Sequence, residues 1–128
     1  MTDTDFSNGT PDADASRGLL VHCAGPAESA GLAGALRSAA NAVAALAPGV
    51  PIEVVVQGPG VGLLARGSTL GESISEALGQ GIRVLACGNS LRSVELAPGQ
   101  LLPGVGSVSA AIAHIATRQW ESWAYIRL

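Results

Sequence analysis

The sequence contains no lysine, and all seven of its cationic residues are arginines, no two of them adjacent. Six of these arginines follow residue 17, where six glutamates balance them, so the formal net charge of −3 arises in the N-terminal segment. Proteins that bind nucleic acid usually carry a clustered basic surface. A neutral body with dispersed arginines therefore argues against nucleic acid as a partner.

Cysteine is scarce as well, with Cys23 and Cys87 alone, and aspartate is absent after residue 14. Two cysteines are too few for a disulfide scaffold or a cysteine-rich metal site, so we expect both thiols to be reduced. Without aspartate in the body and without a Gly-x-Ser-x-Gly motif, a Ser-His-Asp triad has no support. Neither His22 nor His114 has a second ligand at metal-binding spacing, and we predict no metal and no bound cofactor.

Aromatic residues make up only 3% of the chain, although 48% of the residues are hydrophobic and the mean hydropathy is +0.37. The core must therefore be built from alanine, valine, leucine and isoleucine, which favours a compact α/β domain. No apolar run reaches the roughly 18 residues that a membrane span needs, and the acidic N-terminus lacks a signal-peptide pattern. These absences predict a soluble cytoplasmic protein with no membrane partner.

The order of the periodic segments predicts a three-layer α/β/α sandwich with a five-stranded parallel sheet over residues 18–128, after a disordered acidic tail over residues 1–17. Runs of valine and leucine predict strands, and apolar residues at spacings of three and four predict helices. The expected strands are 18–24, 52–57, 83–87, a short strand near Val105, and 123–128. The expected helices are 29–47, a turn over 61–65, a helix through Leu78, 90–96, and a last helix that bears Ile112 and Ile115.

The sequence also predicts how two of these helices begin and how one ends. Thr69 and Glu72 have the spacing of a capping box, and Ser107 or Ser109 can cap the last helix. Gly79 or Gly81 is expected to supply the left-handed residue that ends the helix through Leu78.

The glycine-rich segment over residues 58–68 does not match a nucleotide-binding loop. The Walker motif needs a lysine, which the chain lacks, and Gly60-Val61-Gly62 is not followed by a glycine three positions on. We interpret the segment as flexible backbone around a site.

Cys87 is the residue on which a functional interpretation depends. It ends a buried strand and precedes Gly88-Asn89, which is a turn signal, and Ser90, which is a second candidate cap. At the carboxyl edge of a parallel sheet, unpaired helix N–H groups favour an anion and lower the pKa of a cysteine thiol. The alternative is that Cys87 packs as a small apolar residue, and the spacing leaves both interpretations open.

The two histidines carry less information. His22 lies near the carboxyl end of the first strand, where a lone histidine is more often a hydrogen-bonded structural residue than a catalytic one. His114 shares a helix face with Arg118 and Glu121, which is typical of a solvated or interface face.

Three segments in this order resemble the DsrE/DsrF-like family: VVVQGPG at residues 54–60, ACGNSLR at residues 86–92 and RQWESWAYI at residues 118–126. The resemblance covers residues 19–128. It implies a five-stranded parallel sheet between helices, assembly into dimers, trimers or hexamers, and, in sulfur-relay members, a cysteine that carries sulfur as a persulfide. Two positions depart from the family pattern, because Gln57 stands where many relatives have histidine and Ser122 stands where glycine is usual.

The resemblance therefore implies a sulfurtransferase-type relay with Cys87 as the catalytic residue. The binding residues implied around this thiol are Gly58, Gly60, Gly88, Asn89 and Ser90. The implied partners are further copies of the chain, in a trimer or hexamer, and proteins that donate and accept sulfur. The alternative is a non-catalytic oligomeric binding module of the same fold, with a small-ligand pocket at the carboxyl ends of the strands.

Two further expectations concern the thiols and the C-terminal aromatic residues. If Cys23 and Cys87 end strands that flank a third, their Cα atoms lie about 10 Å apart, too far for a disulfide, and Cys87 is expected to be the more reactive thiol. Trp120, Trp123 and Tyr125 are expected to contribute to the interface between copies. The alternative place for these rings is the core of the monomer.

Overall fold

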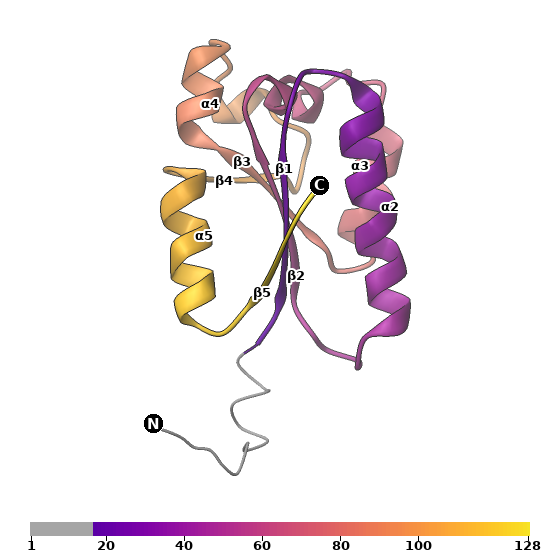
Figure 1. The fold of residues 1–128 in the computed structure, drawn as a ribbon. Helices are drawn as coiled ribbons and strands as arrows, with labels where there is room; N and C mark the ends of the chain where they lie inside the picture. Colours follow the sequence, from indigo (N-terminus) through magenta and orange to yellow (C-terminus); the bar gives the residue numbers. More distant parts are fainter. Residues whose placement is uncertain (1–16) are drawn as a thin grey trace.

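The computed structural model describes residues 17–128, which form one five-stranded sheet with helices on both faces (Figure 1). The tail predicted over residues 1–17 lies outside the described residues, except for Arg17. The strands are β1 (Leu19–Ala24), β2 (Ile52–Gln57), β3 (Arg83–Cys87), β4 (Gly106–Val108) and β5 (Ala124–Arg127). The helices are α2 (Ser29–Ala45), α3 (Gly71–Gly79), α4 (Gly88–Ser93) and α5 (Ala111–Trp120), with the short 3₁₀ helices η1 (Pro59–Leu64) and η2 (Pro98–Gln100).

All strand pairs are parallel, and the strand order β4-β3-β2-β1-β5 confirms the predicted α/β sandwich. From β1 the chain passes outward through β2, β3 and β4, and then adds β5 on the other side of β1. Figure 1 accordingly shows α2 and α3 on one face of the sheet and α5 on the other. The boundary between β1 and β5 is therefore the topological switch point of the sheet.

The side chains of the central strands alternate between the two faces. Val54 and Val56 belong to the core under α2 and α3, whereas Val55 between them belongs to a smaller core under α5. A strand that is buried on both faces reads as a continuous apolar run, and this is why the valine-rich segment predicted β2 with its observed bounds. The same alternation turns Cys23 toward α2 and Cys87 toward α5.

The predicted capping box of Thr69 and Glu72 is wrong. Helix α3 begins at Gly71, with Leu70 at the N-cap position. The side chain that acts here is Ser68, whose hydroxyl oxygen accepts the N–H of Leu70 at 3.0 Å. This serine turn shifts the start of the helix by one residue, which leaves Thr69 outside the cap position.

The predicted caps of the last helix, Ser107 and Ser109, are also wrong, because Ala110 occupies the N-cap position of α5. Ser107 belongs to β4, where its pairing with β3 keeps it in the sheet. The N–H of Ala111, the first residue of α5, instead donates to the sulfur of Cys87 at 3.4 Å. A thiol from a neighbouring strand thus takes the part of a side-chain cap.

The other elements lie close to their predicted positions. The helix predicted over 29–47 ends at Ala45, the strand predicted near Val105 covers residues 106–108, and the helix predicted over 90–96 begins directly after Cys87. Gly81, with a φ of +88°, is the left-handed residue after α3. Within residues 17–128, no helix is both long and apolar enough to cross a membrane, and no three His, Cys, Asp or Glu side chains gather as metal ligands would.

Candidate functional site

Cys87 is the last residue of β3 and occupies the N-cap position of α4. Its side chain is 2% exposed and belongs to the core that also contains Val55, Leu85, Ala111 and Ile115. The predicted strand and turn thus place the thiol at the carboxyl edge of the sheet. It is a buried group at the edge where ligands bind in open α/β sheets.

The N–H of Ala111 donates a hydrogen bond to the Cys87 sulfur at 3.4 Å. Ser90, through its hydroxyl and its N–H, and Asn89, through its N–H, favour the thiolate as well. Burial alone raises the pKa of the thiol, but these hydrogen bonds outweigh burial and hold the pKa of Cys87 below its ordinary value. The site therefore favours the thiolate, which is the nucleophilic form of cysteine.

Ser90 connects Cys87 to the turn that follows β2. Its hydroxyl oxygen accepts the N–H of Gly58 at 2.8 Å, and the same side chain helps to lower the pKa of Cys87. Gly58 has a φ of +85°, a conformation that glycine adopts without strain. Ser90 is therefore not the cap that its position suggested but an inner residue of α4 that joins Cys87 to Gly58.

Gly88 lets α4 approach the segment after β4 closely. A Cβ atom at this position would lie 2.8 Å from the carbonyl oxygen of Val108 and 3.0 Å from that of Ser109. The neighbouring Asn89 accepts a hydrogen bond from Arg92 through its side-chain oxygen. The structure thus gathers four of the five predicted binding residues around Cys87: Gly58, Gly88, Asn89 and Ser90.

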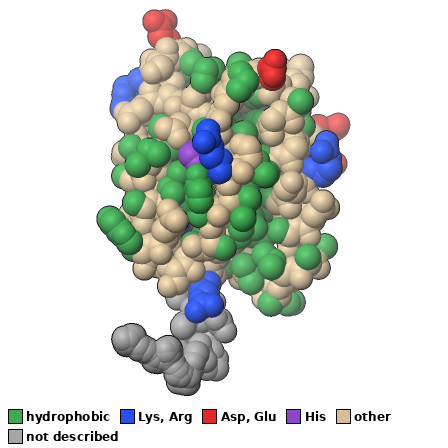
Figure 2. Space-filling view, viewed as in Figure 1, with side chains coloured by type: hydrophobic (Ala, Val, Ile, Leu, Met, Phe, Trp, Pro, Cys, Tyr) green, Lys and Arg blue, Asp and Glu red, His purple; other side chains and the backbone are tan. Residues whose placement is uncertain are grey.

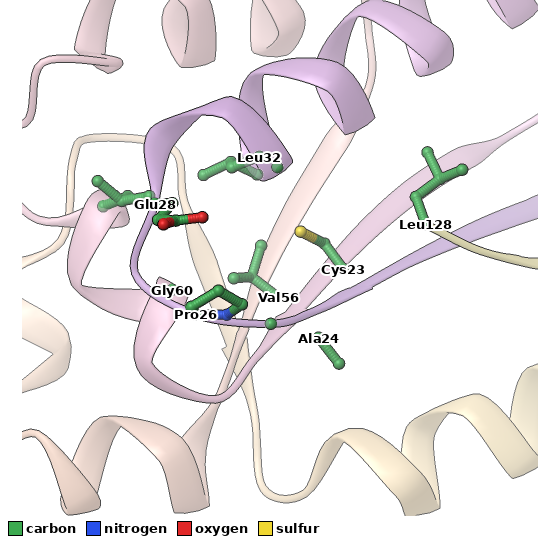
Figure 3. A pocket seen from close by; sticks show the side chains of 11 residues that line it. Cys23, Ala24, Pro26, Glu28, Leu32, Val56, Gly60 and Leu128 are labelled. Atoms are coloured by element: carbon green, nitrogen blue, oxygen red, sulfur yellow. The ribbon is translucent and has the colours of Figure 1, made fainter.

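The fifth predicted binding residue, Gly60, lies instead in the wall of a cavity of about 200 Å³ beside Cys23 (Figure 3). Figure 3 shows the sulfur of Cys23 pointing into the space between α2 and η1. Leu32, Val56 and Leu63 give this cavity a largely apolar lining. Two thiols of the chain therefore lie in two separate environments, one on each face of the sheet.

Cys23 differs from Cys87 in its chemistry as well as in its place. It is half-buried, and burial raises the pKa of its thiol, so the thiol is protonated at neutral pH. Both cysteines are free, and their strands β1 and β3 flank β2. The prediction that they form no disulfide is confirmed.

His22 is a buried residue of β1 with a partner on each ring nitrogen. Its Nε2–H donates to the side-chain oxygen of Gln57 at 2.8 Å, and its Nδ1 accepts the hydroxyl of Tyr125 at 2.7 Å. These bonds satisfy the imidazole, as expected of a structural histidine. Gln57, a departure from the family pattern, therefore serves to hold His22 in one tautomer.

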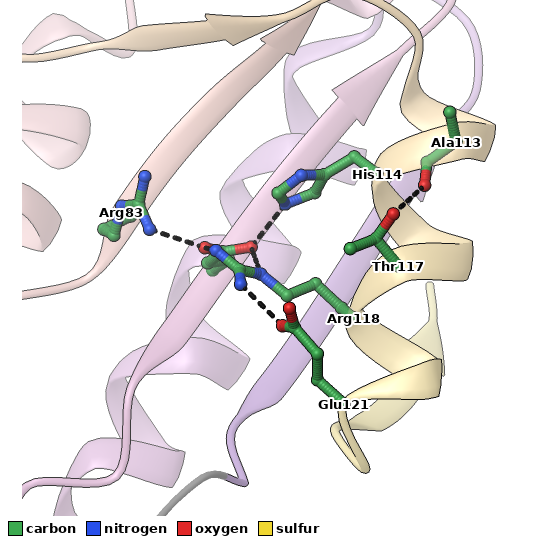
Figure 4. Close-up of polar contacts among 7 residues, drawn as sticks. Arg83, Ala113, His114, Thr117, Arg118 and Glu121 are labelled. Atoms are coloured by element: carbon green, nitrogen blue, oxygen red, sulfur yellow. Dashed lines mark hydrogen bonds and ion pairs between the residues drawn. The ribbon is translucent and has the colours of Figure 1, made fainter.

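A buried carboxylate cluster on the α5 side of the sheet was not predicted. Glu53, in β2, is 0% exposed, and side chains of α5 and β3 bind it (Figure 4). Nε2 of His114 lies 2.6 Å from its Oε1, and its Oε2 lies 2.8 Å from Nη2 of Arg118 and 2.7 Å from Nη1 of Arg83. The solvated or interface face predicted for His114 and Arg118 is therefore wrong, because both side chains turn inward to a buried charge.

The electrostatics of this cluster favour the charged carboxylate. Burial raises the pKa of the Glu53 carboxyl, but the hydrogen bonds and charges of Arg118 and His114 outweigh burial and lower that pKa. The hydrogen bond to Glu53 in turn raises the pKa of Arg118, which also binds Glu121 at 2.8 Å and lies 4.5 Å from the ring centroid of Trp123. One signal was present in the sequence, a glutamate within a valine-rich strand, since buried glutamates are almost always paired.

Comparison with solved structures shows both the fold and a relative. The protein of unknown function MTH1491 from Methanobacterium thermoautotrophicum is 38% identical, with a TM-score of 0.80 over 88% of this chain and 98% of that chain. The ychN protein from E. coli has a TM-score of 0.73 at 13% identity, over 88% of this chain and 99% of its own. The conserved protein of unknown function BT1422 from Bacteroides thetaiotaomicron has a TM-score of 0.69 at 17% identity, over 94% of this chain and 100% of its own.

The structural similarities to these three proteins support different conclusions. No protein-family model and no curated protein matches the chain. The low identities to ychN and BT1422 show the fold alone, which is the fold that the DsrE/DsrF resemblance implies. The identity of 38%, over nearly the whole of MTH1491, goes further than a shared fold. The chain belongs to the same family as MTH1491.

Proposed function

We propose that this protein is a cytoplasmic sulfur carrier of the DsrE/DsrF-like kind, in which Cys87 accepts sulfane sulfur and passes it on as a persulfide. The observation that carries the proposal is the place of the Cys87 sulfur at the carboxyl edge of the sheet, where it accepts the N–H of Ala111 at 3.4 Å and where Ser90 and Asn89 also help to lower its pKa. This environment favours the thiolate, and the thiolate is the form that attacks a persulfide. Cytoplasmic conditions keep such a thiol reduced between transfers.

The proposed transfer has two steps of the thiol–disulfide type. In the first, the Cys87 thiolate attacks the outer sulfur of a donor protein's persulfide, the S–S bond of the donor breaks, and the donor leaves as a thiolate. In the second, a thiolate of the acceptor protein attacks the outer sulfur on Cys87, and Cys87 leaves as a thiolate. Each step forms one S–S bond and breaks one, and the proton of the outer sulfur travels with it, so no oxidant or reductant is required.

The first turn of α5 covers the Cys87 sulfur in this conformation. Ala111 and Ile115 of that helix belong to the same buried cluster as the thiol. A donor therefore reaches the sulfur only when the start of α5 moves away. Local openings of this kind need less free energy than global unfolding, and we expect such an opening to precede each transfer.

A transfer assay tests the proposal. The wild type, Cys87→Ser and Cys23→Ser are each incubated with a low-molecular-weight persulfide and an excess of an acceptor thiol, and the sulfur that reaches the acceptor is followed over time. The wild type and Cys23→Ser are expected to accelerate transfer to the same extent, and Cys87→Ser is expected to give the uncatalysed rate. Acceleration by Cys87→Ser equal to that of the wild type would reject the proposal.

The cavity beside Cys23 favours a second candidate function, that of a module that binds a small and largely apolar molecule. The cavity lies at the carboxyl end of β1, and Leu128, which directly follows β5, contributes to its wall. It is therefore at the switch point of the sheet, where ligands bind in this class of fold. Its volume of about 200 Å³ is below that of most ligand pockets, so only a small molecule fits.

Benzene is a suitable probe for this cavity, because an apolar cavity of similar size binds it. We expect the amide resonances of Cys23, Leu32 and Gly60 to shift when benzene is titrated, and Leu32→Phe, which fills the cavity, to abolish the shifts. Val43→Phe, at an exposed position of the same helix, is the matched control. Absence of shifts in the wild type, or their persistence in Leu32→Phe, would reject this function.

We also propose that the protein assembles with copies of itself, as a trimer or hexamer. Figure 2 shows apolar side chains over much of the face that carries β5, with acidic side chains at its margins. Trp123 and Tyr125 are half-buried against the core under α5, and the part of each ring that stays exposed is available to an interface. The large apolar side chains that α5 and β5 leave exposed are Ile112, Trp120 and Ile126.

A further inference from the structure

Helix α5 joins two features on the same face of the sheet. At its first residue, the N–H of Ala111 donates to the Cys87 sulfur at 3.4 Å. Further along, His114 and Arg118 bind the buried carboxylate of Glu53 at 2.6 and 2.8 Å (Figure 4). The position of one helix thus determines whether the sulfur keeps this donor and whether the sulfur is covered.

Apolar packing alone gives α5 a small anchor. Of its ten residues, Ala111 and Ile115 are buried, while Ile112 is 64% exposed. One alanine and one isoleucine bury little surface for a helix of this length. The contacts of α5 with Glu53 are therefore a large part of what holds the helix on the sheet.

The two arginines that bind Glu53 have different roles. Arg83 approaches from β3, is 57% exposed, and binds the carboxylate at 2.7 Å. It balances the charge of Glu53 but belongs to the sheet, so it does not hold the helix. Arg118 comes from α5 and makes two contacts with the carboxylate, at 2.8 and 3.2 Å, which connect the helix to the sheet.

We propose that Glu53 and Arg118 are positioning residues for Cys87. Their ion pair holds α5 in the place where the N–H of Ala111 stays on the Cys87 sulfur and the first turn of the helix covers it. The inference rests on the proposed role of Cys87 as the reactive thiol. It assigns the buried ion pair a part in sulfur transfer, because the reactivity of the thiol then depends on contacts at the other end of the helix.

The experiment is iodoacetamide labelling over a range of pH, followed by mass spectrometry for each cysteine. The midpoint of the labelling rate against pH gives the thiol pKa of Cys87. The constant rate reached at high pH, the plateau rate, is the labelling rate of its thiolate. Cys23 is a reference in the same molecule. Arg118→Met is the test variant, Arg118→Lys is the conservative variant, and Arg83→Met is the matched control for the loss of one positive charge. Circular dichroism establishes that each variant is folded under the conditions of labelling.

In Arg118→Met we expect the pKa of Cys87 to rise by roughly half a unit, because one hydrogen bond to the thiolate is weakened. We also expect a several-fold higher plateau rate, because the cover opens more often. In Arg118→Lys both the rise in pKa and the increase in plateau rate should be smaller than in Arg118→Met. Arg83→Met should leave Cys87 as in the wild type, and Cys23 should be unchanged in every variant.

An unchanged pKa and plateau rate for Cys87 in folded Arg118→Met would overturn the proposal. Equal changes in Arg83→Met would also overturn it, since the loss of one positive charge near Glu53 would then explain the changes at Cys87 without any movement of α5. A parallel increase at Cys23 and Cys87 would show global unfolding and would reject it too. A failure of sulfur transfer is a separate outcome. The reactivity of Cys87 can depend on Arg118 even if Cys87 carries no sulfur, and Cys87 can carry sulfur even if its reactivity does not depend on Arg118.

Discussion

The pKa values of the two cysteine residues move in opposite directions. Burial raises the pKa of Cys23, whereas hydrogen-bond donors outweigh burial at Cys87 and lower its pKa. The groups that lower the pKa of Cys87 are N–H groups of the turn after β3 and of the first residue of α5, together with the hydroxyl of Ser90. Of these, the hydroxyl of Ser90 is the group that a substitution can remove.

Replacing Ser90 with alanine is expected to raise the pKa of Cys87 by about one unit, because a hydrogen bond to a charged group contributes about 1.5 kcal/mol. At neutral pH, below the raised pKa, less thiolate is present, so iodoacetamide labelling of Cys87 should slow by up to about tenfold. At alkaline pH the rate should approach that of the wild type. Ser93→Ala, which removes an exposed hydroxyl of the same helix, is the control, and a wild-type profile in Ser90→Ala would show that the hydroxyl does not act on the sulfur.

Ser122 is a strained residue, with a φ of +70°, which explains why glycine is usual in the family pattern. Ser122→Gly is expected to raise the free energy of unfolding by about 0.5–1 kcal/mol, because relief of left-handed strain exceeds the added entropy of a glycine. Urea unfolding measures the change. Ser75→Gly, within α3, should instead lower stability by about 0.5 kcal/mol, and a loss of stability in Ser122→Gly would contradict the assignment of strain.

At the scale of the elements, the charge of Glu53 connects β2 to α5. Its pKa is lowered in the folded protein, so its contribution to stability is complete above the ordinary glutamate pKa of about 4.3. The contribution is lost as the pH falls through the lower folded value. The stability that depends on this group is therefore lost on acidification.

Glu53→Gln is expected to be about 3 kcal/mol less stable than the wild type at neutral pH, because Arg83 and Arg118 then face a buried site that has lost their counter-charge. Between about pH 5 and pH 3 it should lose less stability than the wild type, since the titrating group is gone. Urea unfolding at a series of pH values measures both effects. Glu121→Gln, which removes the more exposed partner of Arg118, is the control, and parallel curves for Glu53→Gln and the wild type would contradict the account.

The positions of the strands along the chain could be predicted, because local apolar runs determine where a buried parallel strand forms. The start of α5 could not be predicted, since its first N–H binds a sulfur that is 24 residues away in the sequence. Glu53 meets His114 and Arg118 at separations of 61 and 65 residues. No local sequence pattern predicts such a contact, because the contact depends on how α5 packs on the folded sheet.

The candidate site was predictable to the same degree. The local segment Cys87–Ser90 carries the thiol, the turn and the residues that lower the pKa of the thiol. Gly58 joins them through Ser90, whereas Gly60, only two residues further, lines the cavity beside Cys23. The sequence could not separate these two glycines, because both lie against Gly25 and differ only in the further residues that each one meets.

At the scale of the whole molecule, the sheet separates the two candidate sites. Cys87 lies on the face covered by α5, and Cys23 lies on the face covered by α2. Substitutions in one site are therefore expected to leave the other unchanged. Each site can serve as a control for experiments on the other.

Light scattering of the purified protein at micromolar concentration is expected to show an oligomer. Trp120→Ala should shift the population toward smaller species, because Trp120 is 82% exposed in the monomer and an interface that covers it would lose a large apolar contact. Val43→Ala, on the opposite face of the sheet, is the control and should leave the assembly unchanged. A monodisperse monomer would reject assembly, and an unaltered oligomer in Trp120→Ala would place this residue outside the interface.

Sulfur transfer by this protein requires that Cys87, and not Cys23, carries the sulfur atom. Treatment of the native protein with less than one equivalent of a low-molecular-weight persulfide, followed by removal of the donor and mass spectrometry of the peptides, tests it most directly. We expect a mass increase of one sulfur atom on the peptide that contains Cys87, which a reducing agent reverses, and none on the peptide that contains Cys23. Sulfur on Cys23 alone, or in equal amounts on both cysteines, would show that Cys87 is not the carrier.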